Sequence, residues 1–81
     1  MGRTSLSAAF ARVIQDQRKA KRLSQESLAH KAGLHRTYVG LIERGQRNPT
    51  IEVGHALARA LGNTLSEMIR EAERRVRSAA S

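Results

Sequence analysis

The sequence predicts an all-α fold, a compact bundle of five helices in a single domain. Apolar residues recur every three or four positions along most of the chain, which is the spacing of amphipathic helices. Ser, Thr and Gly stand at the junctions between these segments, where helices start and end. No stretch alternates apolar and polar residues as a half-buried strand does. We therefore treat residues 1–81 as one domain, with a core over about residues 5–76 and a frayed tail over residues 77–81.

The first helix is predicted from about Ser5 to Lys21, with a polar face rich in Arg and Lys. Its buried face carries, at helical spacing, Leu6, Ala9, Phe10, Val13, Ile14 and Gln17.

Residues 23–45, LSQESLAHKAGLHRTYVGLIERG, predict two short helices that meet at a glycine. Ser24 caps the first, because its hydroxyl can accept from the unpaired amides of the opening turn. Gly33 can take the left-handed conformation that ends it, and the second helix begins near His35. The side chains expected between the two helices are Leu28, Ala29, Val39 and Ile42. This is the spacing of a helix-turn-helix, whose second helix enters the DNA major groove.

A loop follows over residues 46–49, because proline lacks an amide donor and holds Asn48 extended. Thr50 caps a fourth helix and Gly62 ends it. The apolar stripe of this helix is Val53, Leu57, Ala60 and Leu61.

Thr64 with Glu67 forms a capping box that opens the fifth helix. Its apolar side carries Leu65, Met68, Ile69, Ala72 and Val76. Ion pairs four residues apart are expected between Glu71 and Arg75 and between Glu73 and Arg77.

Five short segments carry a family resemblance. They are Leu23-Ser24-Gln25, Leu28-Ala29, Gly33-Leu34, Ile42-Glu43-Arg44-Gly45 and Arg47-Asn48-Pro49-Thr50. Together they resemble the Cro/CI-type (XRE, phage repressor) helix-turn-helix regulators. The likeness runs from about Ala11 to Arg70 and implies a lambda-repressor-like bundle. His35-Arg36-Thr37-Tyr38 resembles the recognition-helix start of restriction-modification controller proteins and also suits general regulators of the family. One departure is Arg22, where the family often has glycine, so the turn is made without glycine's freedom or by a shorter connection.

The net charge of +8, from 15 Lys and Arg against seven acids, predicts a polyanionic partner. The aromatic residues Phe10 and Tyr38 are too few for a protein that stacks successive single-stranded bases, which favours duplex DNA. A membrane partner is disfavoured, because no apolar run approaches the roughly 20 residues of a span. Met1 to Ala9 lacks the apolar core of a secretory signal, and there is no cysteine. We expect a prokaryotic cytoplasmic protein associated with the nucleoid.

Base reading is predicted for the first turns of the second helix of the unit. Arg36 can bond both acceptors of a guanine edge, and Thr37 lies beside it at the end that enters the groove. Leu41, one turn further on, either meets a thymine methyl or is partly buried. Tyr38 remains open between a phosphate bond, packing on deformed DNA and simple surface.

Phosphate binding is predicted around the two helix ends that flank these residues. Ser24 and Gln25 open the first helix of the unit, whose free amides form an anion site, and the matching Gln of the resembling repressors binds phosphate. His35 either helps to cap the next helix or touches a phosphate. The residues expected to contact the following stretch of backbone are Arg44, Gln46, Arg47 and Asn48.

Arg18 and Glu43 occupy positions where the resembling repressors pair an Arg of the first helix with a Glu of the third. We favour this structural pair over two exposed charges without coupling.

A metal site and catalysis are both disfavoured. The three histidines, His30, His35 and His55, lack cysteine partners and form no pair four residues apart. Asp16 is the single Asp and no glycine-rich phosphate loop is present. We expect a non-enzymatic chain with no metal, no cofactor and no evident site for a small-molecule effector.

Taken together, these features predict a homodimeric transcriptional regulator of an inverted-repeat operator in double-stranded DNA. The residues expected at the dimer interface are Leu65, Met68 and Ile69 of the fifth helix. The alternative is an antitoxin-like interaction protein, in which DNA binding is secondary to binding a protein partner. A nuclease or other nucleic-acid enzyme ranks third.

Overall fold

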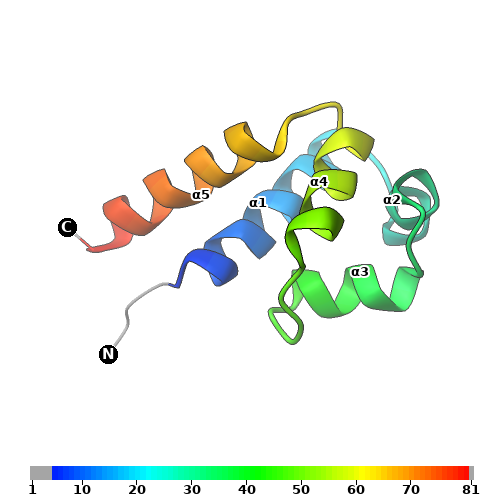
Figure 1. Cartoon of the computed structure of the whole chain (residues 1–81), viewed down its shortest axis with the longest axis horizontal. Coiled ribbons are helices and arrows are strands. Elements are labelled where there is room, and N and C mark those ends of the chain that lie inside the picture. The colour runs from blue at the N-terminus through cyan, green and yellow to red at the C-terminus, as the bar shows by residue number, and fades with distance from the viewer. Residues whose placement is uncertain (1–4, 81) are drawn as a thin grey trace.

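The computed structural model describes residues 5–80 as an all-α bundle, as predicted. The helices are α1 (Leu6–Ala20), α2 (Gln25–Ala32), α3 (Arg36–Glu43), α4 (Ile51–Ala60) and α5 (Leu65–Ala80). Figure 1 shows the two longest helices, α1 and α5, packed side by side, with α2 and α3 at the opposite end of the molecule from the start of α1 and the end of α5. Over residues 5–80 no helix is long and apolar enough to cross a membrane.

Polar side chains start four of the helices, because each hydroxyl accepts from an amide of the first turn that has no helical partner. The hydroxyls of Ser5, Ser24, Thr50 and Thr64 accept, at 2.9–3.1 Å, from the amides of Ala8, Ser27, Val53 and Glu67. The capping box of α5 is half formed, since the Thr64 amide donates to Asn63 Oδ1 at 2.8 Å. His35 occupies the cap position of α3 but makes no side-chain capping bond, so the capping role considered for it is wrong.

Left-handed residues end the helices where the sequence places Gly33 and Gly62, with φ values of 72° and 74°. Arg22, in the turn between α1 and α2, has a φ of 59° and is the non-glycine residue of the described chain with a positive φ. The turn thus keeps the conformation that a glycine would favour, and an arginine adopts it at a cost of about 1–2 kcal/mol.

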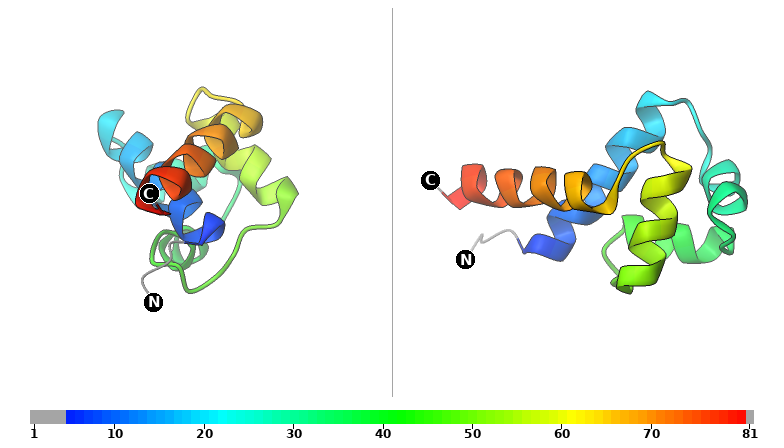
Figure 2. Two further views of the ribbon diagram at one scale, coloured as in Figure 1. Left: turned by 90° about the vertical axis from the view of Figure 1, so that its left-hand side faces the viewer. Right: turned by 45° about the horizontal axis from the view of Figure 1, so that its top comes forward.

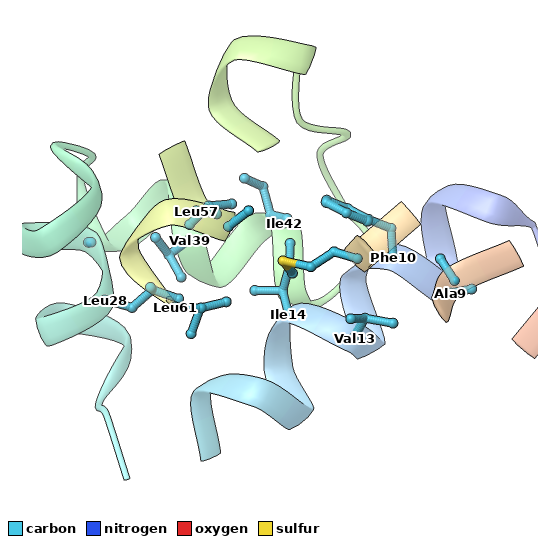
Figure 3. Packing of buried hydrophobic residues seen from close by; sticks show 13 residues of the cluster. Ala9, Phe10, Val13, Ile14, Leu28, Val39, Ile42, Leu57 and Leu61 are labelled. Carbon is cyan, nitrogen blue, oxygen red and sulfur yellow. The ribbon is translucent and has the colours of Figure 1, made fainter. Parts of the chain in front are cut away.

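All five helices contribute side chains to the core, with α1 packed against α5 and α3. Figure 3 shows Phe10 and Ile14 of α1 close to Ile42 of α3, with Leu57 and Leu61 of α4 next to Val39 and Leu28. The fully buried large side chains are Val13, Ile14, Leu28, Val39, Ile42, Leu57, Leu61 and Met68. This core fixes α2 and α3 against the rest of the molecule.

Two expectations for α5 are corrected. Met68 is fully buried in the monomer core, so it has no surface to offer to a second chain. The helix also continues through Ala80 instead of fraying after residue 76, in keeping with the good helix propensity of Arg and Ala. Ser81 lies outside the described residues.

Arg75 connects α5 to α1. Its guanidinium donates to Glu71 at 2.9 Å, as predicted, and to Asp16 of α1 at 2.8 Å. Glu71 also accepts from Arg74 at 2.6 Å, and the hydrogen bonds from Arg74 and Arg75 lower its pKa to about 2. The other predicted pair, Glu73 with Arg77, is not formed within the described part of the helix.

Candidate nucleic-acid interface

The turn between α2 and α3 is built as the sequence predicts. Gly33 ends α2 in the left-handed conformation, and the next amide, of Leu34, donates to the carbonyl of Ala29 at 2.8 Å. The side chains between the two helices, each at most 2 % exposed, are Leu28, Ala29, Val39 and Ile42. A helix pair locked by such a turn and core holds its outer faces at a fixed angle. The views in Figures 1 and 2 show α3 crossing below α2 at the edge of the molecule.

The outward face of α3 carries the predicted base-reading residues. Arg36 and Thr37 are exposed in its first turn, while Tyr38 and Leu41 are half-buried. Tyr38 packs against the core, and the guanidinium carbon of Arg47 lies 5.9 Å from the centroid of its ring. Its ring therefore supports the loop after α3 by a cation–π contact.

A cleft of about 550 Å³ separates the N-terminus of α2 from this face of α3. Its lining residues are Arg18, Ser24, Gln25, Glu26, Arg36, Thr37, Gly40 and Arg44. Residues predicted separately for bases and for phosphates thus meet in one place. Because the Ser24 hydroxyl accepts from the amide of Ser27, the amides of Gln25 and Glu26 are left as the unpaired donors of α2.

The ion pair between Arg18 and Glu43 is present, and Arg18 is one of the residues that line this cleft. Arg18 binds both carboxylate oxygens, through Nε at 2.7 Å and Nη2 at 3.0 Å, and donates to the carbonyl of Leu23 at 2.8 Å. The Glu43 side chain is fully buried, and that of Arg18 is 11 % exposed. Gln25 Nε2 donates to the same carboxylate at 3.0 Å. One buried group therefore joins α1, α2 and α3.

Gly40 brings two polar side chains together across α3. A Cβ atom at this position would lie 3.1 Å from Arg44 Nη1 and 3.4 Å from Gln25 Oε1. Because glycine leaves that space empty, the guanidinium of Arg44 folds back over α3 toward Gln25.

The segment after α3 is held close to it. Gly45 has a φ of 74°, and the amide of Gln46 donates to the carbonyl of Leu41 at 2.9 Å. Arg44, Gln46, Arg47 and Asn48 are all exposed, and Arg44 Nε donates to Gln46 Oε1 at 3.4 Å. His35, the residue directly before α3, is also exposed. Over residues 5–80 no three His, Asp or Glu side chains cluster in a way that could hold a metal ion.

The sequence comparisons agree with this geometry. A helix-turn-helix family profile matches residues 14–68, which covers all of α2, α3 and α4. The chain belongs to the XRE-type helix-turn-helix family of transcriptional regulators. The control protein C.SmaI of Serratia marcescens is 41% identical to it over 60 residues, 74% of this chain and 71% of that protein.

Solved structures are similar to this regulator over most of its length. The restriction-modification controller protein C.AhdI from Aeromonas hydrophila is 44% identical, with a TM-score of 0.72 over 78% of this chain and 94% of that one. The clp gene regulator ClgR from Corynebacterium glutamicum has a TM-score of 0.89 over 96% of this chain and 83% of that one. At 22% identity, this second likeness speaks for the fold alone. The regulator is therefore a non-enzymatic, controller-like, DNA-binding member of its family.

Sequence reasoning missed two residues of the regulator's cleft. Gly40 lies mid-helix, and a glycine inside a helical pattern was the available signal that a close approach occurs there. Glu26 directly follows Gln25, and its place in the same first turn was the signal for its proximity to the cleft.

Proposed function

We propose that this regulator binds an inverted-repeat operator as a homodimer and controls transcription by occupying it. The observation that carries the proposal is the convergence of Arg36 and Thr37 with the α2 N-terminus and Arg44 in one cleft. Base-edge donors and phosphate-binding groups must lie side by side in this way for a recognition helix to read a groove while the backbone is held.

Arg36 is the principal base reader in this proposal. It is exposed in the first turn of α3, and its planar guanidinium matches the O6 and N7 acceptors of guanine. Thr37 reads the neighbouring base, and Leu41 offers an apolar surface to a thymine methyl. Tyr38 reaches the DNA at the edge of the groove, with Arg47 stacked beside its ring.

Phosphates are bound on both sides of the recognition helix. On one side the amides of Gln25 and Glu26 form the anion site, with the side chains of Ser24 and Gln25 beside it. The second strand is bound by exposed side chains that precede or follow α3. These are His35, Arg44, Gln46, Arg47 and Asn48.

The dimer contact is placed on an apolar groove that includes Leu65 and Ile69 of α5. Its volume is about 440 Å³, and Leu6 and Ile51 on its walls are 43% and 78% exposed. Asn48 to Thr50, which also line it, directly follow the recognition helix region. A second copy related by a two-fold axis can insert its Ile51 into this groove, while its own groove receives Ile51 of the first copy. Such an exchange is what an isologous interface requires.

Such a dimer sets the operator's geometry. Two recognition helices that enter successive major grooves on one side of the duplex lie about 34 Å apart, so half-site centres are about 10 bp apart. We also propose that the protein acts in the bacterial cytoplasm on the nucleoid, since the relatives named above are bacterial.

Selection from a randomised duplex library, followed by footprinting, tests this function. We expect enrichment of an inverted repeat, protection of two half-sites, and two chains bound per duplex. Enrichment of no sequence would contradict the proposal. Stable co-purification with a different protein chain seated on the apolar groove would favour the antitoxin-like alternative.

A further inference from the structure

Glu26 is the one carboxylate among the residues that line the cleft, where Arg36 and Arg44 supply positive charge and the charge of Arg18 is already paired with Glu43. Its Oε1 lies 3.5 Å from Nη1 of Arg36. The two side chains are 74% and 69% exposed, so solvent screening leaves the pair little to contribute to the fold. The Glu26 carboxylate nevertheless lies next to Arg36, the side chain best placed to read a base.

We propose that Glu26 is a specificity-determining residue, which neutralises and holds Arg36 until a guanine edge presents its two acceptors. This role rests on the proposed function, because it acts on base reading by Arg36. It adds to that function a charge that weakens binding to the wrong DNA.

The Glu26–Arg36 contact is long enough for Arg36 to leave Glu26 and bind a guanine edge instead. Charge-assisted N–H to carboxylate bonds are about 2.7–2.9 Å long, whereas this pair is 3.5 Å apart. The pair is thus held by charge and not by a short hydrogen bond. The guanidinium keeps N–H donors for a guanine, whose two parallel bonds replace a weak contact by a stronger one.

On random DNA no guanine edge is aligned with Arg36, so the guanidinium stays with the Glu26 carboxylate. Glu26 then cancels the charge of Arg36 from a distance well inside the Debye length of about 8–10 Å. Because Glu26 follows Gln25 at the start of α2, its own charge also lies close to any phosphate bound there, on the operator and on random DNA alike. Phosphate attraction supplies most of non-specific affinity, so cancelling the charge of Arg36 weakens binding to random DNA more than binding to the operator.

The test compares two duplexes, the operator selected by the wild-type chain and a shuffled duplex of the same composition. Affinities are measured over a salt series for the wild type, Glu26→Gln, Arg36→Ala and the double variant. Glu73→Gln is the matched control, since it removes the same charge from an exposed site on α5, far from α2 and α3 in Figure 1.

We expect Glu26→Gln to tighten binding to the shuffled duplex and to reduce the operator-to-shuffled affinity ratio about threefold. The slope of log affinity against log salt on the shuffled duplex should steepen by about one per chain, because Arg36 becomes available to a phosphate. In the Arg36→Ala background the same change should leave the ratio unaltered. Glu73→Gln should leave the ratio at the wild-type value.

An unchanged ratio in Glu26→Gln, or an equal change in the Arg36→Ala background, would overturn this role and make Glu26 a general surface charge. A wild-type chain that enriches no operator contradicts the proposed function itself, and that result is obtained before any variant is compared.

Discussion

The arginines of this interface differ in how exposed they are and in which groups they contact. Arg36 is exposed at the start of the recognition helix, whereas Arg18 is almost fully enclosed and satisfied by Glu43 and Leu23. Arg47 lies between these extremes, exposed but stacked on Tyr38. In the proposed function the same residue type therefore reads bases at Arg36, stabilises the fold at Arg18 and binds phosphate at Arg47, according to its partners.

Arg36→Ala and Arg47→Ala should separate base reading from phosphate binding. The first should cost about 1–3 kcal/mol on the operator and relax discrimination at one position of each half-site, because a bidentate base contact carries sequence information. The second should weaken operator and random DNA alike and reduce the salt slope by about one. Competition among single-base operator variants measures both. Unchanged base preference in the Arg36 variant would remove it from the readers.

The Arg18–Glu43 pair should show strong coupling in a double-mutant cycle. Arg18→Met leaves a fully buried carboxylate with Gln25 as its remaining donor and should cost about 3–5 kcal/mol of unfolding free energy. Glu43→Gln should cost less, because Arg18 is partly exposed and keeps the Leu23 carbonyl. The double variant should be more stable than the sum of the single effects predicts. Denaturant melts of the four proteins suffice, and strict additivity would contradict a buried pair.

At the scale of helices, two connections hold the recognition unit in place. The buried Glu43 joins α3 to α1 and α2, and the contacts of α5 with α1 brace the helix that carries Arg18. Arg75 closes the second connection by bridging Asp16 and Glu71. The position of α3 thus depends on side chains distant in sequence.

The brace between α1 and α5 should respond to acid. The pKa of Glu71 is lowered to about 2, so its contribution is complete above the ordinary carboxyl pKa and is lost as the pH falls toward 2. The stability difference between wild type and Glu71→Gln should therefore shrink on acidification from about pH 5 to about pH 2.

Urea melts at a series of pH values measure this difference. Glu73→Gln serves as the control on the same helix, because Glu73 is exposed and forms no ion pair in the described residues. A wild-type to Glu71→Gln difference that stays constant over the acid range would contradict the assigned role.

At the scale of the whole molecule, the DNA-binding end and the apolar groove are linked through one loop. The fold measures 37 × 23 × 22 Å, and the residues after α3 lead directly into the groove wall at Asn48, Pro49 and Thr50. A second copy bound there would fix the spacing between two recognition helices. With a net charge of +8 on each chain, DNA binding also offsets the repulsion between the copies.

Ile51→Asp and Met68→Asp should behave in opposite ways. Ile51 is 78% exposed in the monomer, so its replacement should give a folded monomer that binds one half-site weakly and ignores half-site spacing. Met68 is fully buried, so an Asp there should unfold the chain. Sedimentation and circular dichroism distinguish these outcomes. A wild-type monomer at concentrations well above its operator dissociation constant, with one chain per operator, would falsify the dimer.

The sequence by itself determined the helices and the helix-turn-helix. Capping by Ser24 and Thr50, termination at Gly33 and the helical spacing of apolar residues are local properties, because each acts within one or two turns of its own helix. The Arg18–Glu43 pair was also predicted, although from family resemblance and not from local pattern.

Only the tertiary structure decided which groups of similar chemistry are buried or paired. Met68 and Ile51 are both large and apolar, but the packing of α5 against α1 and α4 buries Met68, whereas Ile51, at the first position of α4, is 78% exposed. Arg75 reaches Asp16, 59 residues away, while Glu73 and Arg77 on the same helix stay apart. Burial and ion pairing depend on which side chains of neighbouring helices lie close by. The spacing of residues within one helix carries no information about those neighbours.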